Sequence, residues 1–335
     1  MRWYSIASTD ASFNVLTVSH VAALARRASM SSSYKPALLK ALVRIVAATA
    51  DTEISFERLG AEFLRLYWTQ TVVFRLRQAA SLTKEPEVVQ EIRRVATANR
   101  VRELRDLSVV ERLKLESRLA RVLPINVIDA FHASKPAAMQ PLFTRVSKGG
   151  IRLTADTPAF LRDNAGALQA IANLWWASYL EKVNQLAPLI IQKVERDGAR
   201  RTSVAKYLEL LRSLDGPCCF YCERTISGTV KGHVDHVIPW SFMLSNPLWD
   251  LVVACERCNI AKSDVLPHRD YLIKLTANHI QRAKAAVPSG IASPLLAADE
   301  IARYYDAALG VEWPAGWQPL GGGEGPTIGE HKATI

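Results

Sequence analysis

The sequence predicts a mainly α-helical protein that carries a small metal-stabilised domain in its C-terminal half. Two observations lead to this prediction. Over long stretches, apolar residues recur at spacings of three and four, which is typical of amphipathic helices. All five cysteines instead fall within residues 218–258, where they contain two C-x-x-C pairs, a pattern typical of zinc-stabilised folds.

The composition limits the class of protein. Of the 335 residues, 49% are hydrophobic and 22% are charged, which excludes a largely disordered or collagen-like chain. No apolar, charge-free stretch reaches the ~20 residues of a membrane span, and the first residues lack the apolar core of a signal peptide, so we expect a cytoplasmic protein. The formal net charge of +10 favours a polyanionic partner such as nucleic acid, although solubility alone also accounts for it.

The N-terminal half is predicted to be helical. Residues 1–33 are rich in Ser, Thr and Ala, and we expect this segment to be partly flexible. A helical domain is predicted for residues 34–200, beginning at Tyr34. One or two of its helices are expected between Pro86 and Pro124, because proline is tolerated in a first helical turn but not in a helix interior.

The later part of this domain contains a looser connection and a long apolar stretch. The segment 133–158 has three prolines and two glycines, so no regular element is predicted there. Helical spacing returns over 159–196, where Trp175 and Trp176 fall at core positions and are predicted to be buried rather than to stack on bases. The helical domain is too large for a linker, and DNA recognition, regulation, oligomerisation and partner binding remain open roles for it.

Three segments are expected after the helical domain. Residues 201–275 contain the cysteines and form the small metal-stabilised domain. C-terminal helices are predicted within 276–313 from the return of helical spacing. A flexible tail is predicted for 314–335, which contains Gly321–Gly323 and a further proline.

The cysteine spacing predicts a structural zinc site. Cys219 with Cys222, and Cys255 with Cys258, form two tight turns that can each supply two thiolates to a tetrahedral ion, while Cys218 is left over. Such a site leaves no open position for substrate and serves the fold. A redox dithiol is the alternative, but it is typical of a βαβ pattern, and neither it nor unligated buried thiols explain two matched pairs.

The segment between the two cysteine pairs predicts a ββα unit. Valines and polar residues around Gly232 are typical of short strands, and the pattern after Cys255 becomes helical, with Asn259 in the first turns. Asp235 and His236 are neighbours on an extended chain, so their side chains point to opposite sides. A carboxylate there can bind a cation while the imidazole faces a water molecule.

These residues resemble the HNH endonuclease family. The resemblance covers roughly 50 residues, includes both C-x-x-C pairs, and is carried by the segments Asp235–Trp240, Leu248–Val252 and Cys258–Asp264. It implies a ββα-metal nuclease in which His236 is the general base that deprotonates the attacking water. It further implies that Asp235 and Asn259 hold one Mg²⁺ or Mn²⁺ ion and that hydrolysis leaves a 5′-phosphate and a 3′-hydroxyl.

The resemblance also suggests nucleic-acid contacts and contains one departure. Lys262 and Arg257 are candidate phosphate contacts on the helix. His233 lies on the strand face of Asp235 and could approach the metal or a phosphate, or be an ordinary surface histidine. Asp250 stands where the family has an asparagine that braces a loop, and an ionised carboxylate can accept the bracing hydrogen bonds but cannot donate them.

The sequence therefore predicts a metal-dependent HNH endonuclease that cleaves DNA, with RNA as another possible substrate. The start of the helical domain, Tyr34–Leu42, resembles helical extensions that precede such modules in bacterial restriction and anti-phage proteins, which favours a defence role. A homodimer or a partner protein bound through the helical domain is also expected. The alternatives are a non-catalytic zinc module that binds nucleic acid or protein, and a toxin-like nuclease held inactive by a partner.

Overall fold

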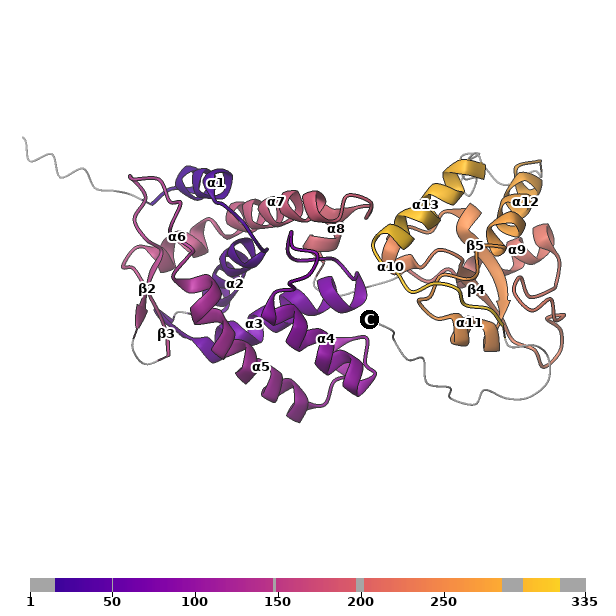
Figure 1. Ribbon diagram of the computed structural model, residues 1–335, viewed down its shortest axis with the longest axis horizontal. Coiled ribbons are helices and arrows are strands. Elements are labelled where there is room, and N and C mark those ends of the chain that lie inside the picture. Colours follow the sequence, from indigo (N-terminus) through magenta and orange to yellow (C-terminus); the bar gives the residue numbers. More distant parts are fainter. Residues whose placement is uncertain (1–15, 50, 147–148, 197–201, 285–297, 320–335) are drawn as a thin grey trace, which may run out of the picture. The chain divides into compact units, whose positions relative to one another are not determined.

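The computed structural model describes residues 16–49, 51–146, 149–196, 202–284 and 298–319. These residues fall into two compact units, each with its own core. The N-terminal unit comprises the described residues of Met1–Gln185 and Ile190–Gly198, and the C-terminal unit comprises those of Leu186–Leu189 and Ala199–Ile335. The prediction of a mainly helical protein is confirmed in both units (Figure 1).

The N-terminal unit is a helical assembly. The amphipathic pattern places the apolar face of each helix inside, and α2 is the most deeply enclosed, because α3, α6 and α7 all pack against it. Trp175 and Trp176 on α7 are buried, as predicted. The helices of this unit are α1 (Val18–Arg27), α2 (Tyr34–Ala48), α3 (Phe56–Trp68), α4 (Glu87–Asn99), α5 (Val109–Leu123), α6 (Thr157–Asp163), α7 (Ala165–Val183) and α8 (Ile190–Glu195), with the shorter turns η1 (Thr69–Val73), η2 (Leu104–Asp106) and η3 (Pro124–Ile128).

Helices α3 and α5 cross closely, and one glycine permits the contact. A Cβ atom on Gly60 would lie 2.6 Å from the Glu116 carbonyl oxygen and 3.0 Å from the Ala120 nitrogen, both backbone atoms of α5. No side chain fits in that space without separating the two helices. The position of Gly60 in the amphipathic helix α3 therefore has a packing reason that the sequence pattern alone did not reveal.

A small antiparallel sheet in this unit was not predicted. It has the order β1–β3–β2, with β1 (Glu53–Ser55), β2 (Phe143–Val146) and β3 (Gly150–Leu153), and Ile54 opposite Ile151. The looser connection predicted over 133–158 therefore contains two strands. Strands of three or four residues are too short to show a clear alternation, and the glycine beside one of them obscured the pattern further.

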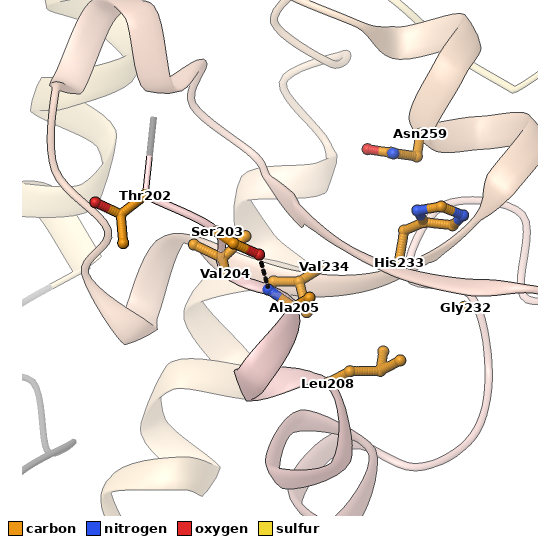
Figure 2. Close-up of a pocket in the computed structure, with 9 residues that line it drawn as sticks. All are labelled: Thr202, Ser203, Val204, Ala205, Leu208, Gly232, His233, Val234 and Asn259. Carbon is orange, nitrogen blue, oxygen red and sulfur yellow. Dashed lines mark hydrogen bonds between the residues drawn. The ribbon is translucent and has the colours of Figure 1, made fainter. Parts of the chain in front are cut away.

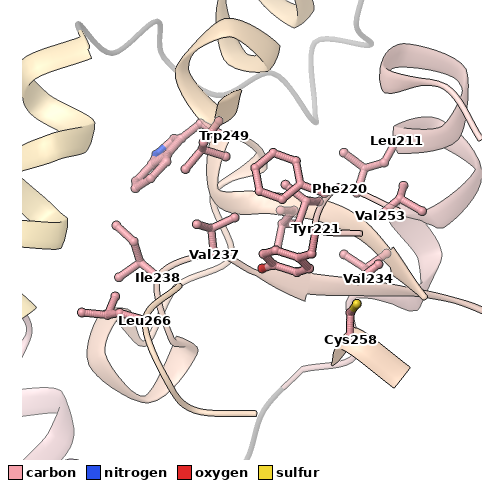
Figure 3. Packing of buried hydrophobic residues seen from close by; sticks show 14 of the residues in the cluster. Leu211, Phe220, Tyr221, Val234, Val237, Ile238, Trp249, Val253, Cys258 and Leu266 are labelled. Carbon is pink, nitrogen blue, oxygen red and sulfur yellow. The ribbon is translucent and has the colours of Figure 1, made fainter. Parts of the chain in front are cut away.

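The C-terminal unit surrounds a short antiparallel pair of strands. Strand β4 (Gly232–His236) pairs with β5 (Leu251–Cys255), with Asp235 opposite Val252 and His236 opposite Leu251. One apolar cluster joins the strands to the helices and the cysteine turn (Figure 3). The other elements are η4 (Ala205–Tyr207), α9 (Leu208–Asp215), α10 (Trp240–Met243), η5 (Leu248–Asp250), α11 (Glu256–Lys262), α12 (Tyr271–Lys284) and α13 (Ala298–Gly310).

The C-terminal helices belong to the same core as the cysteine region. Arg282 on α12 is almost fully buried, where it pairs with Asp215 of α9 and donates hydrogen bonds to the carbonyls of Leu248 and Leu251. Ile301 of α13 lies in the same apolar cluster. The described residues of the segments 201–275 and 276–313, which were predicted as separate segments, thus belong to one unit.

The two chain ends are more ordered than expected over part of their length. Residues 18–27 of the N-terminal segment form α1, and residues 1–15 lie outside the described residues. At the other end, Pro314 and Trp317 form backbone hydrogen bonds with Leu266 and His268, so the predicted flexible tail is corrected for residues 314–319. The rest of that tail, from residue 320, is not among the described residues. Within the described chain, none of the helices has both the length and the apolar character needed to cross a membrane.

Candidate active site

The four paired cysteines converge on one point. Their sulfur atoms all lie within 4.8 Å of one another, and the Cys222 and Cys255 sulfurs are 3.8 Å apart. Cys219 and Cys222 come from the turn after α9, Cys255 ends β5, and Cys258 lies in the first turn of α11. The turn is fixed to the sheet, because the Phe220 amide donates a hydrogen bond of 2.8 Å to the Val253 carbonyl.

This donor set fits a zinc ion. In a tetrahedral site with Zn–S bonds of about 2.3 Å, the sulfurs lie about 3.8 Å apart, which agrees with the Cys222–Cys255 separation of 3.8 Å. Burial and the neighbouring cysteines raise the pKa of the Cys258 thiol. A divalent cation would stabilise the thiolates, and the four cysteines could therefore hold structural zinc. Cys218 is exposed and stands outside the cluster.

Asp235 lies on the face of β4 that meets α11. The Asp235 side chain is 7% exposed. The Tyr221 hydroxyl donates to its Oδ2 atom at 2.7 Å, and the Lys262 ammonium lies 3.1 Å from the same oxygen. Both partners therefore approach one side of the carboxylate, and among the described residues no donor reaches Oδ1.

Lys262 does not contact solvent, which corrects its predicted role as a phosphate contact. The side chain is completely buried, and its ammonium also donates a hydrogen bond of 2.6 Å to the His236 carbonyl. The last turn of the short helix α11 directs this side chain under β4 rather than outward. Lysine is rarely buried without a partner, and here the Asp235 carboxylate and the His236 carbonyl supply the partners that burial requires.

His236 lies at the end of β4, with its side chain on the face opposite Asp235 as the alternation of a strand requires. The ring is 2% exposed, and its Nε2 atom donates a hydrogen bond of 2.9 Å to the Asn246 side-chain oxygen. In this arrangement the ring is held in one orientation by the segment between α10 and η5.

Asn259 and His233 line a common pocket at the edge of β4 (Figure 2). The cavity has a volume of about 310 Å³, with the hydroxyl-bearing residues Thr202 and Ser203 on its far side. Val234 and Leu208 supply apolar surface. A pocket of this size is at the lower end of the range for small-ligand sites.

Asn259 and Lys262 both lie on the helix α11. This helix packs against both strands, and Asn259 precedes Lys262 by three residues, which places the two side chains on neighbouring parts of one helix face. Since Lys262 reaches Asp235, that face is directed at β4. Arg257, in the first turn of α11, is exposed and is therefore accessible to a partner.

Asp250 braces the loop after β4. Its Oδ1 atom accepts a hydrogen bond of 2.8 Å from the Ile238 amide, and its carbonyl accepts one of 3.0 Å from Val237. Both contacts use Asp250 as an acceptor. Aspartate can therefore make these contacts at the position where the family has asparagine.

Two residues of this site were not identified from the sequence. Tyr221 lies inside the first cysteine turn, where only the cysteines carried a recognisable pattern, and Asn246 lies in an irregular segment. Both are found through contacts between residues that are distant in the chain, Tyr221 with Asp235 and Asn246 with His236. No spacing rule links such pairs, so only the structure reveals them.

One comparison with known proteins matches the part of the chain that contains this site. Residues 219–264 match the family model described as HNH endonuclease. The match includes the four clustered cysteines, Asp235, His236 and Asn259. No curated protein and no solved structure matches the chain.

Proposed function

We propose that the HNH endonuclease domain at residues 219–264 hydrolyses phosphodiester bonds of DNA with a divalent cation held by Asp235 and Asn259. The family match carries this proposal, because that family cleaves nucleic acid. Its support in the structure is the placement of Asp235 on the β4 face that meets α11, the helix that carries Asn259. The net charge of +10 is consistent with a polyanionic substrate.

The donor chemistry of the site suits a hard cation. A carboxylate oxygen and a side-chain amide oxygen are ligands that Mg²⁺ and Mn²⁺ accept, and the Asp235 Oδ1 atom is the carboxylate oxygen that the protein's described donors leave available. When bound, such a cation would stabilise the negative charge that develops on the phosphate and the leaving oxygen. Asp235 and Asn259 would hold it from β4 and α11.

In this proposal His236 accepts a proton from the attacking water. Imidazole is the usual side chain for that role at physiological pH. Because the ring is 2% exposed and held by Asn246, the role requires Asn246 to release it when substrate enters. Since Asp235 and His236 face opposite sides of β4, the phosphate would lie at the end of that strand. Attack in line there would leave a 5′-phosphate and a 3′-hydroxyl.

The nucleic-acid strand would extend over the exposed side of this unit. Arg257 is exposed on α11 and can pair with a phosphate. The pocket beside Asn259 offers an imidazole and two hydroxyl groups next to apolar surface, which suits a sugar-phosphate segment. His233 lies two residues before Asp235 on β4 and therefore on the same face of that strand.

Replacing His233 with alanine is expected to weaken DNA binding and leave the chemical step intact. Loss of one hydrogen bond to a phosphate would raise the KM for DNA about 2- to 10-fold, while kcat stays near the wild-type value. Steady-state cleavage at saturating Mg²⁺ measures both constants. His268→Ala is the matched control, since His268 is outside this pocket. A changed kcat with an unchanged KM would contradict the placement of the strand.

The cleavage activity itself is tested with the full chain and supercoiled plasmid. Purified protein is expected to nick or linearise DNA with Mg²⁺ or Mn²⁺ and to be inactive with EDTA at equal protein concentration. A panel with linear duplex, single-stranded DNA and RNA identifies the substrate form. Intact nucleic acid in every arm, with zinc-loaded and folded protein, would refute the nuclease proposal.

The biological setting that we propose is restriction or phage defence in the cytoplasm. It rests on the resemblance of Tyr34–Leu42 to the helical extensions of such proteins, and this segment is the first part of α2. In this setting the N-terminal unit would recognise DNA, form a homodimer or bind a partner protein. A reduced plaque count in cells that express the wild-type chain, compared with His236→Ala, would support the setting.

A non-catalytic zinc module that binds nucleic acid or protein is the second candidate. The observation that favours it is the enclosure of His236, because a binding module needs no accessible base. It predicts DNA binding that survives alanine at Asp235, His236 and Asn259, without cleavage under any metal condition. Cleavage that these substitutions abolish would exclude it. Co-purification with an inhibitory partner would instead indicate the toxin-like alternative.

A further inference from the structure

The Asp235 carboxylate is held on one side by two buried donors. Tyr221 donates to Oδ2 at 2.7 Å, and the Lys262 ammonium lies 3.1 Å from the same atom. Tyr221 is 3% exposed and Lys262 is completely buried. A carboxylate fixed in this way cannot rotate freely, so its Oδ1 atom keeps one direction.

Tyr221 is itself part of the four-cysteine turn. It lies between Cys219 and Cys222, and its backbone carbonyl accepts a hydrogen bond of 3.1 Å from the Tyr271 hydroxyl. Its ring packs edge-on against Phe220, Tyr271 and Trp317. Figure 3 shows Tyr221 among the buried apolar residues of this unit. The position of its hydroxyl is therefore set by the cysteine turn and by the aromatic residues around it.

A phenol hydroxyl is a hydrogen-bond donor at ordinary pH, and the Tyr221 hydroxyl lies 2.7 Å from the Asp235 carboxylate. Tyr221 therefore acts as a donor to Asp235 and not as a second anion beside it.

We propose that Tyr221 is a positioning residue that connects the four-cysteine cluster to the catalytic cation, by holding the Asp235 carboxylate so that Oδ1 faces the cation. This inference rests on the proposed function, because it takes Asp235 as a cation ligand. It assigns the cysteine turn a role beyond stabilising the fold. Groups that orient a metal ligand in this way change metal affinity or activity about 10- to 100-fold when they are removed.

Mn²⁺ binding to the zinc-loaded full chain tests this inference directly. Tyr221→Phe removes only the hydroxyl, and we expect the dissociation constant for Mn²⁺, measured by electron paramagnetic resonance of the free ion, to rise about 10- to 100-fold. The Mn²⁺ concentration that gives half-maximal cleavage should rise in parallel, with kcat largely recovered at saturating Mn²⁺. Tyr305→Phe is the matched control, because it also removes a buried hydroxyl from this core, one that bonds the Pro267 carbonyl.

The outcomes separate this inference from the proposed function. If wild type cleaves DNA and Tyr221→Phe binds Mn²⁺ as tightly as wild type, the positioning role is refuted and the nuclease proposal stands. If Tyr221→Phe loses zinc or helix content, its Mn²⁺ affinity no longer tests the positioning role. A comparison of wild type with Asp235→Ala then provides the test. Mg²⁺ should then perturb the near-ultraviolet absorption of a buried tyrosine in wild type but not in Asp235→Ala, and the absence of that difference would overturn the inference.

Discussion

Replacing His236 with alanine is expected to reduce the rate of DNA cleavage about 10²- to 10⁴-fold, the usual contribution of a positioned general base. The alanine cannot accept the proton of the attacking water, whereas Asp235 and Asn259 would still hold the cation. The initial rate of plasmid nicking at saturating Mg²⁺ measures the loss. Mn²⁺ affinity should remain near the wild-type value, since the ring lies on the opposite face of β4 from Asp235.

The burial of His236 makes a second variant necessary. Alanine would leave a cavity at a ring that is 2% exposed, and such cavities destabilise a core. His236→Gln keeps much of the volume and can still donate a hydrogen bond to Asn246, but it has no basic nitrogen. Equal loss of activity in both variants, with thermal unfolding of the glutamine variant near that of wild type, would assign the effect to chemistry. Wild-type rates in His236→Gln would contradict the general-base role.

Removal of zinc is expected to unfold the C-terminal unit. Structural zinc sites bind with about 10–16 kcal/mol of apparent free energy, which is comparable with the ~5–15 kcal/mol by which a typical domain is stable. The four sulfurs join the turn after α9, the end of β5 and the start of α11, so the ββα arrangement depends on them. Cys258→Ser should therefore lower the zinc content, the melting temperature of this unit and cleavage together.

A cysteine outside the cluster provides the control for this experiment. Cys218 is exposed and is next to Cys219 in sequence, so Cys218→Ser changes the same kind of atom without touching the cluster. Metal analysis and thermal unfolding of the full chain should show wild-type behaviour for this variant. If Cys258→Ser kept both its zinc and its melting temperature, the assignment of the cluster as a structural zinc site would be wrong.

The two proposed metal sites would share a structural support. Tyr221 belongs to the cysteine turn and bonds Asp235, while Lys262 lies one turn after Cys258 and contacts both Asp235 and the His236 carbonyl. Zinc loss would therefore remove the support of the Asp235 carboxylate as well as part of the fold. The zinc-dependent stability and the affinity for the second cation should change together.

Much of the helical fold follows from local pattern. The apolar residues of α2 recur at helical spacing, and all of those from Leu38 to Val46 that define its inner face are buried. The sheet of β1, β2 and β3 was missed because each strand has three or four residues, too few for a period of two to be distinguished. The order of contacts between helices was not predictable either, since it depends on close approaches such as that at Gly60.

The sequence by itself determined which chemistry the site contains, because residue type and spacing define a C-x-x-C pair, a neighbouring Asp235 and His236, and an asparagine at the start of a helix. Only the tertiary structure decided what each group touches: that Lys262 is buried against Asp235, that Asn246 holds His236, and that Tyr221 links the cysteine turn to a carboxylate. The reason is physical. Donor atoms are a property of each residue, whereas burial and hydrogen-bond partners arise when segments distant in the chain pack together.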